Sequence, residues 1–199
     1  MKWTYVLIVL AILSLIIQIY VQYKKRSAQE YLTGLLSSGK YDEFDEAVDS
    51  DRIKRWIPEF NRLYVKLNKE IMCGNADKVE DIINGVRLMN LGDTYKGKIY
   101  TLIYNYYLSR KDYERCKEYY KLISGIKNYD THELDITHNT FVRNGYKYLD
   151  EVMDKMNSLP ENQRGVYELL IGKMYRNKGE TDKAIEYESL AGKHMRQGG

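Results

Sequence analysis

The chain is poor in the residues that interrupt helices. Its 199 residues include only two prolines, Pro58 and Pro160, and turn pairs such as Asn-Gly are rare. Proline lacks the backbone N–H that a helix interior needs, so a chain with so few prolines can form long helices. The alternation of apolar and polar residues that is typical of strands is missing after Ser27. The sequence therefore predicts an all-α fold.

Cysteine and histidine are too scarce to indicate a metal or redox centre. Cys73 and Cys116 lie in unrelated segments without a CxxC pair, so each is interpreted as a small buried hydrophobic residue. Besides His194, the histidines are His132 and His138, six positions apart. Histidine pairs that bind zinc on a helix favour i, i+4 spacing instead. We expect no metal and no cofactor.

Charge of one sign does not gather in any block. The 31 basic and 28 acidic residues are mixed along the chain and leave a net charge of +3. A nucleic-acid surface needs clustered lysine and arginine, so binding to nucleic acid is not expected. A GxSxG motif and a phosphate-binding glycine loop are also missing. Nothing in the sequence favours an enzyme.

One long apolar run is present near the N-terminus, where residues 3–23 carry no charged side chain. At about 1.5 Å per residue, a helix of this length extends roughly 31 Å and can cross the hydrocarbon core of a bilayer. Trp3 and Tyr5 lie near one end, and Tyr20 and Tyr23 near the other, as at membrane surfaces. A cleaved signal peptide has a shorter apolar region that ends in small residues. The run therefore predicts an uncleaved, single-pass anchor in the lipid bilayer.

The flanks of this run predict its orientation and the domain boundary. Three basic residues at 24–26 follow the run directly, whereas only Lys2 and the terminal amine precede it. Because basic residues close to a span favour the cytoplasmic side, the remainder of the chain is predicted to be cytoplasmic. Residues 1–26 are interpreted as the anchor with its basic flank, and residues 27–199 as a helical repeat domain.

Polar breaks recur at a regular interval after Ser27, each joining two helical runs through a glycine or polar turn. The aligned residues that end these breaks are Phe44, Val79, Cys116, Asp150 and Ala184. Their intervals of 35, 37, 34 and 34 residues are typical of a solenoid built from helical hairpins, here about five. Because a buried carboxylate is costly, we expect the helix at Asp150 to be rotated, with Leu149 inward and Asp150 exposed.

The last of these hairpins resembles the tetratricopeptide repeat. That family has an early glycine in the first helix, an aromatic residue one turn later, a glycine at the turn, and small residues in the second helix. The matching residues here are Gly172, Tyr175, Gly179, Ala184 and Ala191. The resemblance is clearest at 162–195 and covers about 27–195 in outline. It implies an α-solenoid of stacked hairpins that binds a protein or peptide.

The same resemblance implies a binding groove. The position after the early glycine faces the concave surface in tetratricopeptide domains, where an amide can hold the backbone or carboxylate of a bound peptide. This position is occupied by Asn68, Asn105, Asn139 and Lys173, and one turn further on lie Arg143 and Arg176. Thr101 stands where chaperone-binding members carry a clamp lysine, so recognition of a specific C-terminal tail is not implied.

Two functions are consistent with these observations. In the first, the chain is a membrane-tethered adaptor that captures a partner protein or peptide in its groove. In the second, it is a structural or assembly subunit of a membrane complex, or associates with its own copy. The ratio of 20 tyrosines to three phenylalanines suits half-buried seams between thin helical layers better than a deep dry core. In the second function the array would pack against its partner through tyrosine-rich helix surfaces. The tyrosines assigned to such a surface are Tyr104, Tyr106, Tyr107, Tyr113, Tyr119 and Tyr120.

Overall fold

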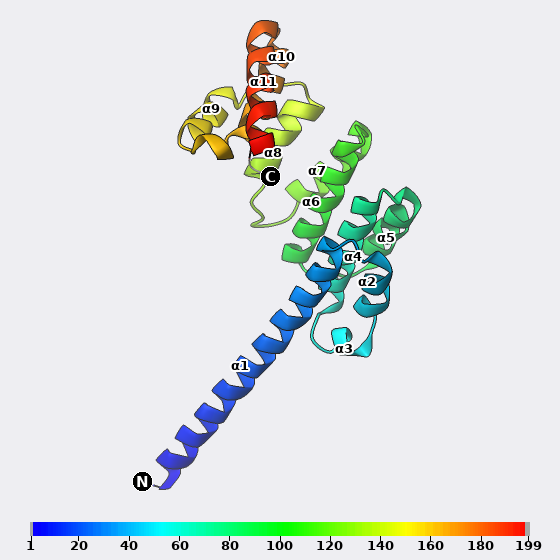
Figure 1. Cartoon of the computed structure of the whole chain (residues 1–199), viewed down its shortest axis with the longest axis vertical. Helices are drawn as coiled ribbons and strands as arrows, with labels where there is room; N and C mark the ends of the chain where they lie inside the picture. The colour runs from blue at the N-terminus through cyan, green and yellow to red at the C-terminus, as the bar shows by residue number, and fades with distance from the viewer. Residues whose placement is uncertain (1, 198–199) are drawn as a thin grey trace. The chain divides into compact units, whose positions relative to one another are not determined.

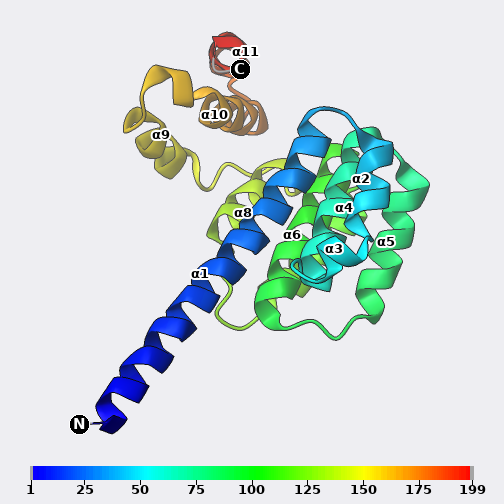
Figure 2. The same cartoon turned by 60° about the horizontal axis from the view of Figure 1, so that its bottom comes forward.

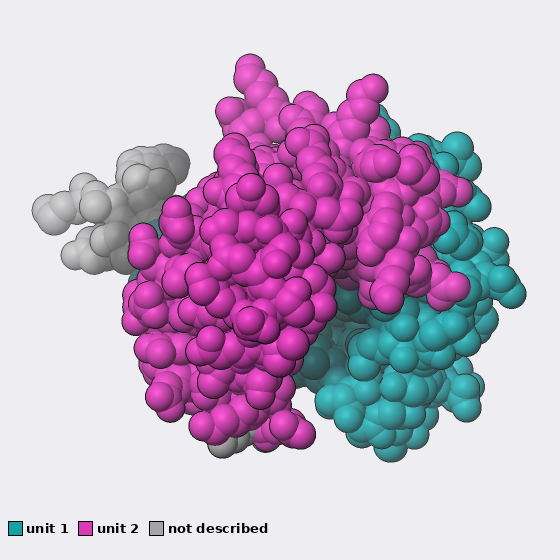
Figure 3. Space-filling model, turned by 90° about the horizontal axis from the view of Figure 1, so that it is seen from above, with its two compact units in different colours: residues 1–90 teal, residues 91–199 magenta. Residues whose placement is uncertain are grey.

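The computed structural model describes the backbone of residues 2–197 and the side chains of residues 10–196. Every regular element in this part of the chain is helical, as Figures 1 and 2 show, so the all-α prediction is confirmed. The chain divides into two compact units, residues 1–90 and residues 91–199, which Figure 3 colours separately. Each unit has a hydrophobic core of its own.

Unit 1 contains two helical hairpins and a short connecting helix. The bounds are α1 (Lys2–Ser37), α2 (Tyr41–Val48), α3 (Asp51–Lys54), α4 (Glu59–Cys73) and α5 (Ala76–Leu88). α1 pairs with α2, α4 pairs with α5, and α2 also packs on α4. Leu32, Phe44 and Ile53 are fully buried in the first of these hairpins and its connection. Pro58 directly precedes α4, where its missing N–H leaves no helical bond unmade.

The described part of α1 corrects the predicted membrane anchor. The side chains of residues 3–9 lie outside the described residues. Among the described residues, no helix is long and apolar enough to span a membrane. The prediction of a single-pass membrane protein with a cytoplasmic domain is overturned by this finding. α1 also continues unbroken to Ser37, so the helix has no boundary at residue 26.

Unit 2 contains three further hairpins. The bounds are α6 (Asp93–Ser109), α7 (Tyr113–Ser124), α8 (His132–Thr137), the π-helix η1 (His138–Val142), α9 (Leu149–Asn157), the 3₁₀ turn η2 (Glu161–Gln163), α10 (Gly165–Lys178) and α11 (Thr181–Gln197). α6 pairs with α7, and α10 pairs with α11, which lie side by side in Figure 2. η1 packs against both α7 and α10, and α9 against α10. The hydrophobic core cluster of this unit is formed by α8, α9, α10 and α11, and η1 links this cluster to α7.

Each of the five hairpins turns on a residue in the left-handed conformation. These residues are Gly39, Gly74, Lys111, Asn144 and Gly179, with φ between 51° and 87°. They follow one another at intervals of 35, 37, 33 and 35 residues. At four of them the next N–H bonds to a carbonyl five residues back, as Lys40 does to Leu35 at 2.9 Å. This arrangement satisfies the last carbonyls of the first helix and ends it.

The left-handed residue fixes which side chain faces inward in the second helix. The residues five positions after the turns are Phe44, Val79, Cys116, Leu149 and Ala184, and none is more than 7% exposed. The alignment of Asp150 with this column was wrong by one residue. The expectation that Leu149 packs inward and Asp150 is exposed is confirmed. A carboxylate at this crossing would lose its water, whereas leucine gains from burial.

The tyrosines assigned to a docking surface are mostly core residues. Tyr104 and Tyr119 are completely buried in unit 2, and Tyr106 and Tyr107 are 7% and 3% exposed. The rings of Tyr107 and Tyr119 stack with their centroids 5.7 Å apart. The prediction of a tyrosine-rich interface is therefore wrong for these four residues, because they hold α6 and α7 together instead.

We expect Gly179→Ala to destabilise unit 2 by about 1–2 kcal/mol. A Cβ atom at Gly179 would meet nothing within 4 Å, so only the strain of a left-handed alanine acts. Lys111→Gly should have the opposite sign or no effect, because glycine relieves the same strain at φ 59°. Urea unfolding followed by circular dichroism checks both changes. Equal destabilisation by the two variants would contradict the role of these turns.

We expect Ala184→Leu to destabilise unit 2 by about 1–3 kcal/mol, because a larger side chain overpacks a filled crossing. Ala184 is completely buried, and its carbonyl lies 3.2 Å from the position of a Cβ atom built on Gly172. The matched control is Ser189→Leu at an exposed position of the same helix, which should stay within about 0.5 kcal/mol. Urea unfolding that shifts equally in both variants would show that Ala184 lies at no close crossing.

Candidate functional site

The asparagines predicted to line a groove have different environments. Asn68 belongs to α4 in unit 1, half-buried, and its amide donates to the Tyr64 carbonyl at 2.9 Å. Asn139 lies in η1, where its side-chain oxygen accepts from the Lys147 backbone N–H at 3.3 Å. Both side chains therefore stabilise local structure. Asn105 on α6 is exposed, and no hydrogen bond of its side chain is found within the described residues.

The three predicted basic groove residues all belong to unit 2. Arg176 is held by Glu188 on α11 through two bonds of 3.0 and 2.6 Å. Lys173 lies 3.4 Å from the side-chain oxygen of Asn144 at the neighbouring turn. Arg143 follows η1 and lies over the Tyr120 ring, 5.8 Å from its centroid. In the described part of the chain Arg143 forms no ion pair, so it is the predicted cation that is freest to bind a ligand.

Arg143 borders an open pocket of about 620 Å³ between α7 and η1. We call this the α7–η1 pocket. It is lined by Lys117, Tyr120, Lys121, Ser124, Gly125, His138 and Arg143. Four of these residues lie on one face of α7 because they follow the i, i+3, i+4, i+7 spacing of a helix. The pocket therefore brings one face of α7 together with the C-terminal end of η1.

Tyr120 is the centre of the pocket wall. The His138 ring stacks on it, with centroids 3.9 Å apart and planes 12° from parallel. Its hydroxyl donates to Asp135 at 2.8 Å, and the Thr131 hydroxyl donates to the same carboxylate at 3.2 Å. Burial and the bond to Asp135 raise the pKa of Tyr120 above its usual value. Asp135 thus holds the Tyr120 ring at its hydroxyl, and the His138 imidazole covers one of its faces. The Arg143 guanidinium also lies over the ring.

His138 is buried and neutral at physiological pH. Its Nδ1 atom shares a 3.3 Å hydrogen bond with the hydroxyl of Tyr104, which is completely buried. Burial, followed by the positive charge of Arg143, lowers the pKa of His138 to about 4. Lys117 acts in the same direction, and Asp135 opposes it. Both Arg143 and Lys117 are therefore close enough to the imidazole for their charges to act on it.

The pocket carries three cations and no carboxylate among its lining residues. Lys117 pairs with the exposed Glu114 at 2.8 Å, a contact that contributes less than about 1 kcal/mol in water. Lys121 and Arg143 form no ion pair among the described residues. Amines, a guanidinium and hydroxyls are all hydrogen-bond donors to anionic oxygen. The arrangement suits an anion better than a cation or an apolar group.

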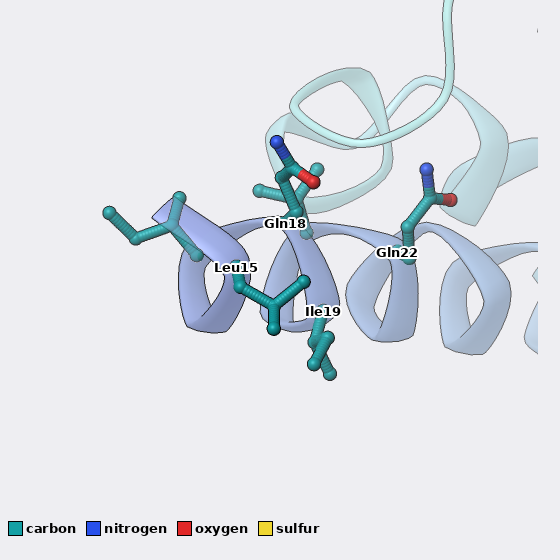
Figure 4. Close-up of a pocket in the computed structure, with 6 residues that line it drawn as sticks. Leu15, Gln18, Ile19 and Gln22 are labelled. Atoms are coloured by element: carbon teal, nitrogen blue, oxygen red, sulfur yellow. The ribbon is translucent and has the colours of Figure 1, made fainter. Parts of the chain in front are cut away.

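Two other features, a depression on α1 and a buried histidine–glutamate contact in unit 2, are explained by the fold itself. Figure 4 shows a depression on α1 lined by Leu15, Gln18, Ile19 and Gln22 together with two further residues of α1, and one helix alone encloses no cavity. In unit 2 the buried His194 ring lies 2.9 Å from both oxygens of Glu168, which joins α11 to α10. No group of three histidine, cysteine or carboxylate side chains in the described residues converges as metal ligands would.

Sequence reasoning found part of the pocket. Arg143 was predicted as a groove residue, whereas Lys117 and Lys121 were not singled out, because only the fold brings α7 next to η1. His138 was considered only as a metal ligand. Comparison of the chain with known protein families, curated proteins and solved structures gives no match. The tetratricopeptide resemblance stays a prediction.

We expect nuclear magnetic resonance of the three imidazoles to show one that titrates near pH 4, and His138→Asn to remove that signal. His132 should titrate above its ordinary value of 6.5, because a hydrogen bond to Glu151 raises its pKa. The folded pKa of His138 is below the unfolded value, so stability is complete above about pH 6.5 and falls as the pH drops toward 4. The loss is roughly 3 kcal/mol. A His138 signal that titrates above pH 6 would contradict its burial as a neutral ring.

Proposed function

We propose that this chain is a helical-hairpin repeat scaffold that binds a partner protein or peptide. The observation that carries the proposal is the recurrent turn. Five left-handed residues, 33 to 37 positions apart, each place a buried side chain five residues later. Repeated hairpins that cover one another bury a continuous core and leave extended surfaces for binding.

The last hairpin supports this proposal residue by residue. Gly172 is buried so closely that a Cβ atom would lie 2.9 Å from the Glu188 side chain. Gly179 supplies the left-handed turn at φ 87°. Ala184 and Ala191 are buried with at most 1% of their surface exposed. Small residues at these positions let α10 and α11 approach each other, which is the reason a repeat of this kind needs them.

The surface proposed for binding is formed by the first helices of the unit 2 hairpins. Asn105 on α6 is exposed, Lys173 on α10 is half-buried, and Arg143 is exposed beside the α7–η1 pocket. An amide and two cations offer donors to the backbone and side chains of an extended segment. The alternative of a subunit that packs through tyrosines has less support, because most of those tyrosines are buried.

Site-specific photo-crosslinking in the cells that express the full chain tests this function. A photoreactive residue at Asn105 or Lys173 should yield the same crosslinked partner. The controls are Ile185 and Ser189 on α11, exposed positions of a second helix that does not line the α7–η1 pocket, and they should not crosslink to it. Asn105→Ala should also reduce recovery of the partner without changing helix content. Equal crosslinking from all four positions, or from the controls alone, would contradict a groove on the first helices.

A further inference from the structure

We propose that the α7–η1 pocket binds a carboxylate of an acidic peptide segment, held between Lys117 and Arg143 over the edge of the His138 ring. This inference rests on the proposed function, since it assigns the chemistry of the partner. The pocket lies entirely within unit 2, so α7 and η1 alone define its geometry.

The charge of the pocket is the first support. Lys117, Lys121 and Arg143 all border it, and its lining includes no aspartate or glutamate. Arg176 and Lys155 of this unit have carboxylate partners in Glu188 and Glu133, and Lys117 has the exposed Glu114, whereas Lys121 and Arg143 form no ion pair among the described residues. Like charges gathered without a counter-charge repel one another. A bound anion would reduce this repulsion, so the charges of the pocket favour an anionic ligand.

The rigid framework behind the cations is the second support. The Arg143 N–H bonds to the His138 carbonyl five residues back at 3.1 Å, which fixes the backbone that carries the guanidinium. The Tyr120 ring lies beneath that guanidinium and is itself held by Asp135 and His138. A charged group supported in this way loses less conformational freedom when it binds than a free surface side chain does.

The π-helix is the third support, because it sets this hairpin apart. The bond that closes the fourth turn runs from the Gly145 N–H to the Asn139 carbonyl, six residues back, whereas the other four turns close over five. One extra residue is therefore accommodated where η1 places His138 and Arg143 against α7. π-helical turns are rare, and they frequently lie at functional sites.

The open mouth of the pocket favours a carboxylate of an extended peptide over a small free anion. It is open to solvent along α7, where Lys121 and Ser124 continue the row of donors beyond Lys117. A single small anion would use the cations at one end only. Several carboxylates on an extended segment can follow the whole row, one turn of α7 after another.

The test titrates the full-length protein with acetyl-tetraglutamate amide. Binding is followed by calorimetry, and the titration of the His138 imidazole is followed by nuclear magnetic resonance. Arg143→Gln and Lys117→Gln should each weaken binding about fivefold or more. Arg143→Lys, which keeps the charge, should recover most of it. The matched control is Lys193→Gln on α11, an exposed lysine outside the pocket, which should change the affinity less than about twofold.

The imidazole gives a readout that a general charge effect does not move. His138 is faced by Arg143, Lys117, Asp135, Tyr104 and Tyr120. A carboxylate that neutralises the first two should raise the pKa of His138 on saturation and leave that of the exposed His132 unchanged. The proposal is overturned if all three glutamine variants weaken binding equally, or if the peptide leaves the His138 titration unchanged.

A titration with inorganic phosphate at matched ionic strength distinguishes a free anion from a peptide carboxylate as the ligand. Phosphate should bind more weakly than the peptide and displace it poorly. If phosphate binds and the peptide does not, the pocket is a site for a free anion and the acidic-peptide proposal is wrong. Peptide binding without crosslinks at Asn105 would overturn the groove on the first helices and leave this site standing. If the full-length protein does not bind the peptide and the crosslinks persist unchanged in Arg143→Gln, the pocket proposal is wrong and the groove on the first helices stands.

Discussion

The reversal of the chain at a left-handed residue is the constraint on which the rest of the structure depends. At Gly39, Gly74 and Gly179 the missing Cβ atom makes this conformation free of strain. The N–H groups that follow then close the end of one helix and fix the start of the next. Because that start is fixed, the side chain five positions later can only face inward. Burial of these side chains supplies the apolar contact that holds each hairpin closed.

The hairpins could be predicted from the sequence wherever glycine marks the turn, and less well where it does not. Lys111 and Asn144 take the same left-handed conformation without being glycine. The register at Asp150 was therefore set by a uniform spacing of 34, whereas the turns at these two residues are 33 apart. The cost of burying a carboxylate pointed to Leu149 as the inward residue, so an energetic argument located the helix face better than the spacing did.

The tyrosines and the apolar N-terminal run show what composition alone does not decide. A tyrosine ring can lie on a surface or in a core, and only the neighbours on α6 and α7 determine that Tyr104 and Tyr119 are completely buried. Likewise, the apolar run near the N-terminus predicts a membrane span from its length, but no helix among the described residues is long and apolar enough to cross a bilayer.

The two buried histidines of unit 2 show why the α7–η1 pocket stays electropositive. His194 faces a carboxylate, since both oxygens of Glu168 lie 2.9 Å from its Nδ1 atom. His138 faces the hydroxyl of Tyr104 instead, and the nearest carboxylate, Asp135, is occupied by Tyr120 and Thr131. A hydroxyl satisfies the imidazole without adding negative charge. Arg143 therefore forms no ion pair among the described residues, and Lys117 has only the exposed Glu114. A ligand that supplies further negative charge completes the electrostatics of the pocket.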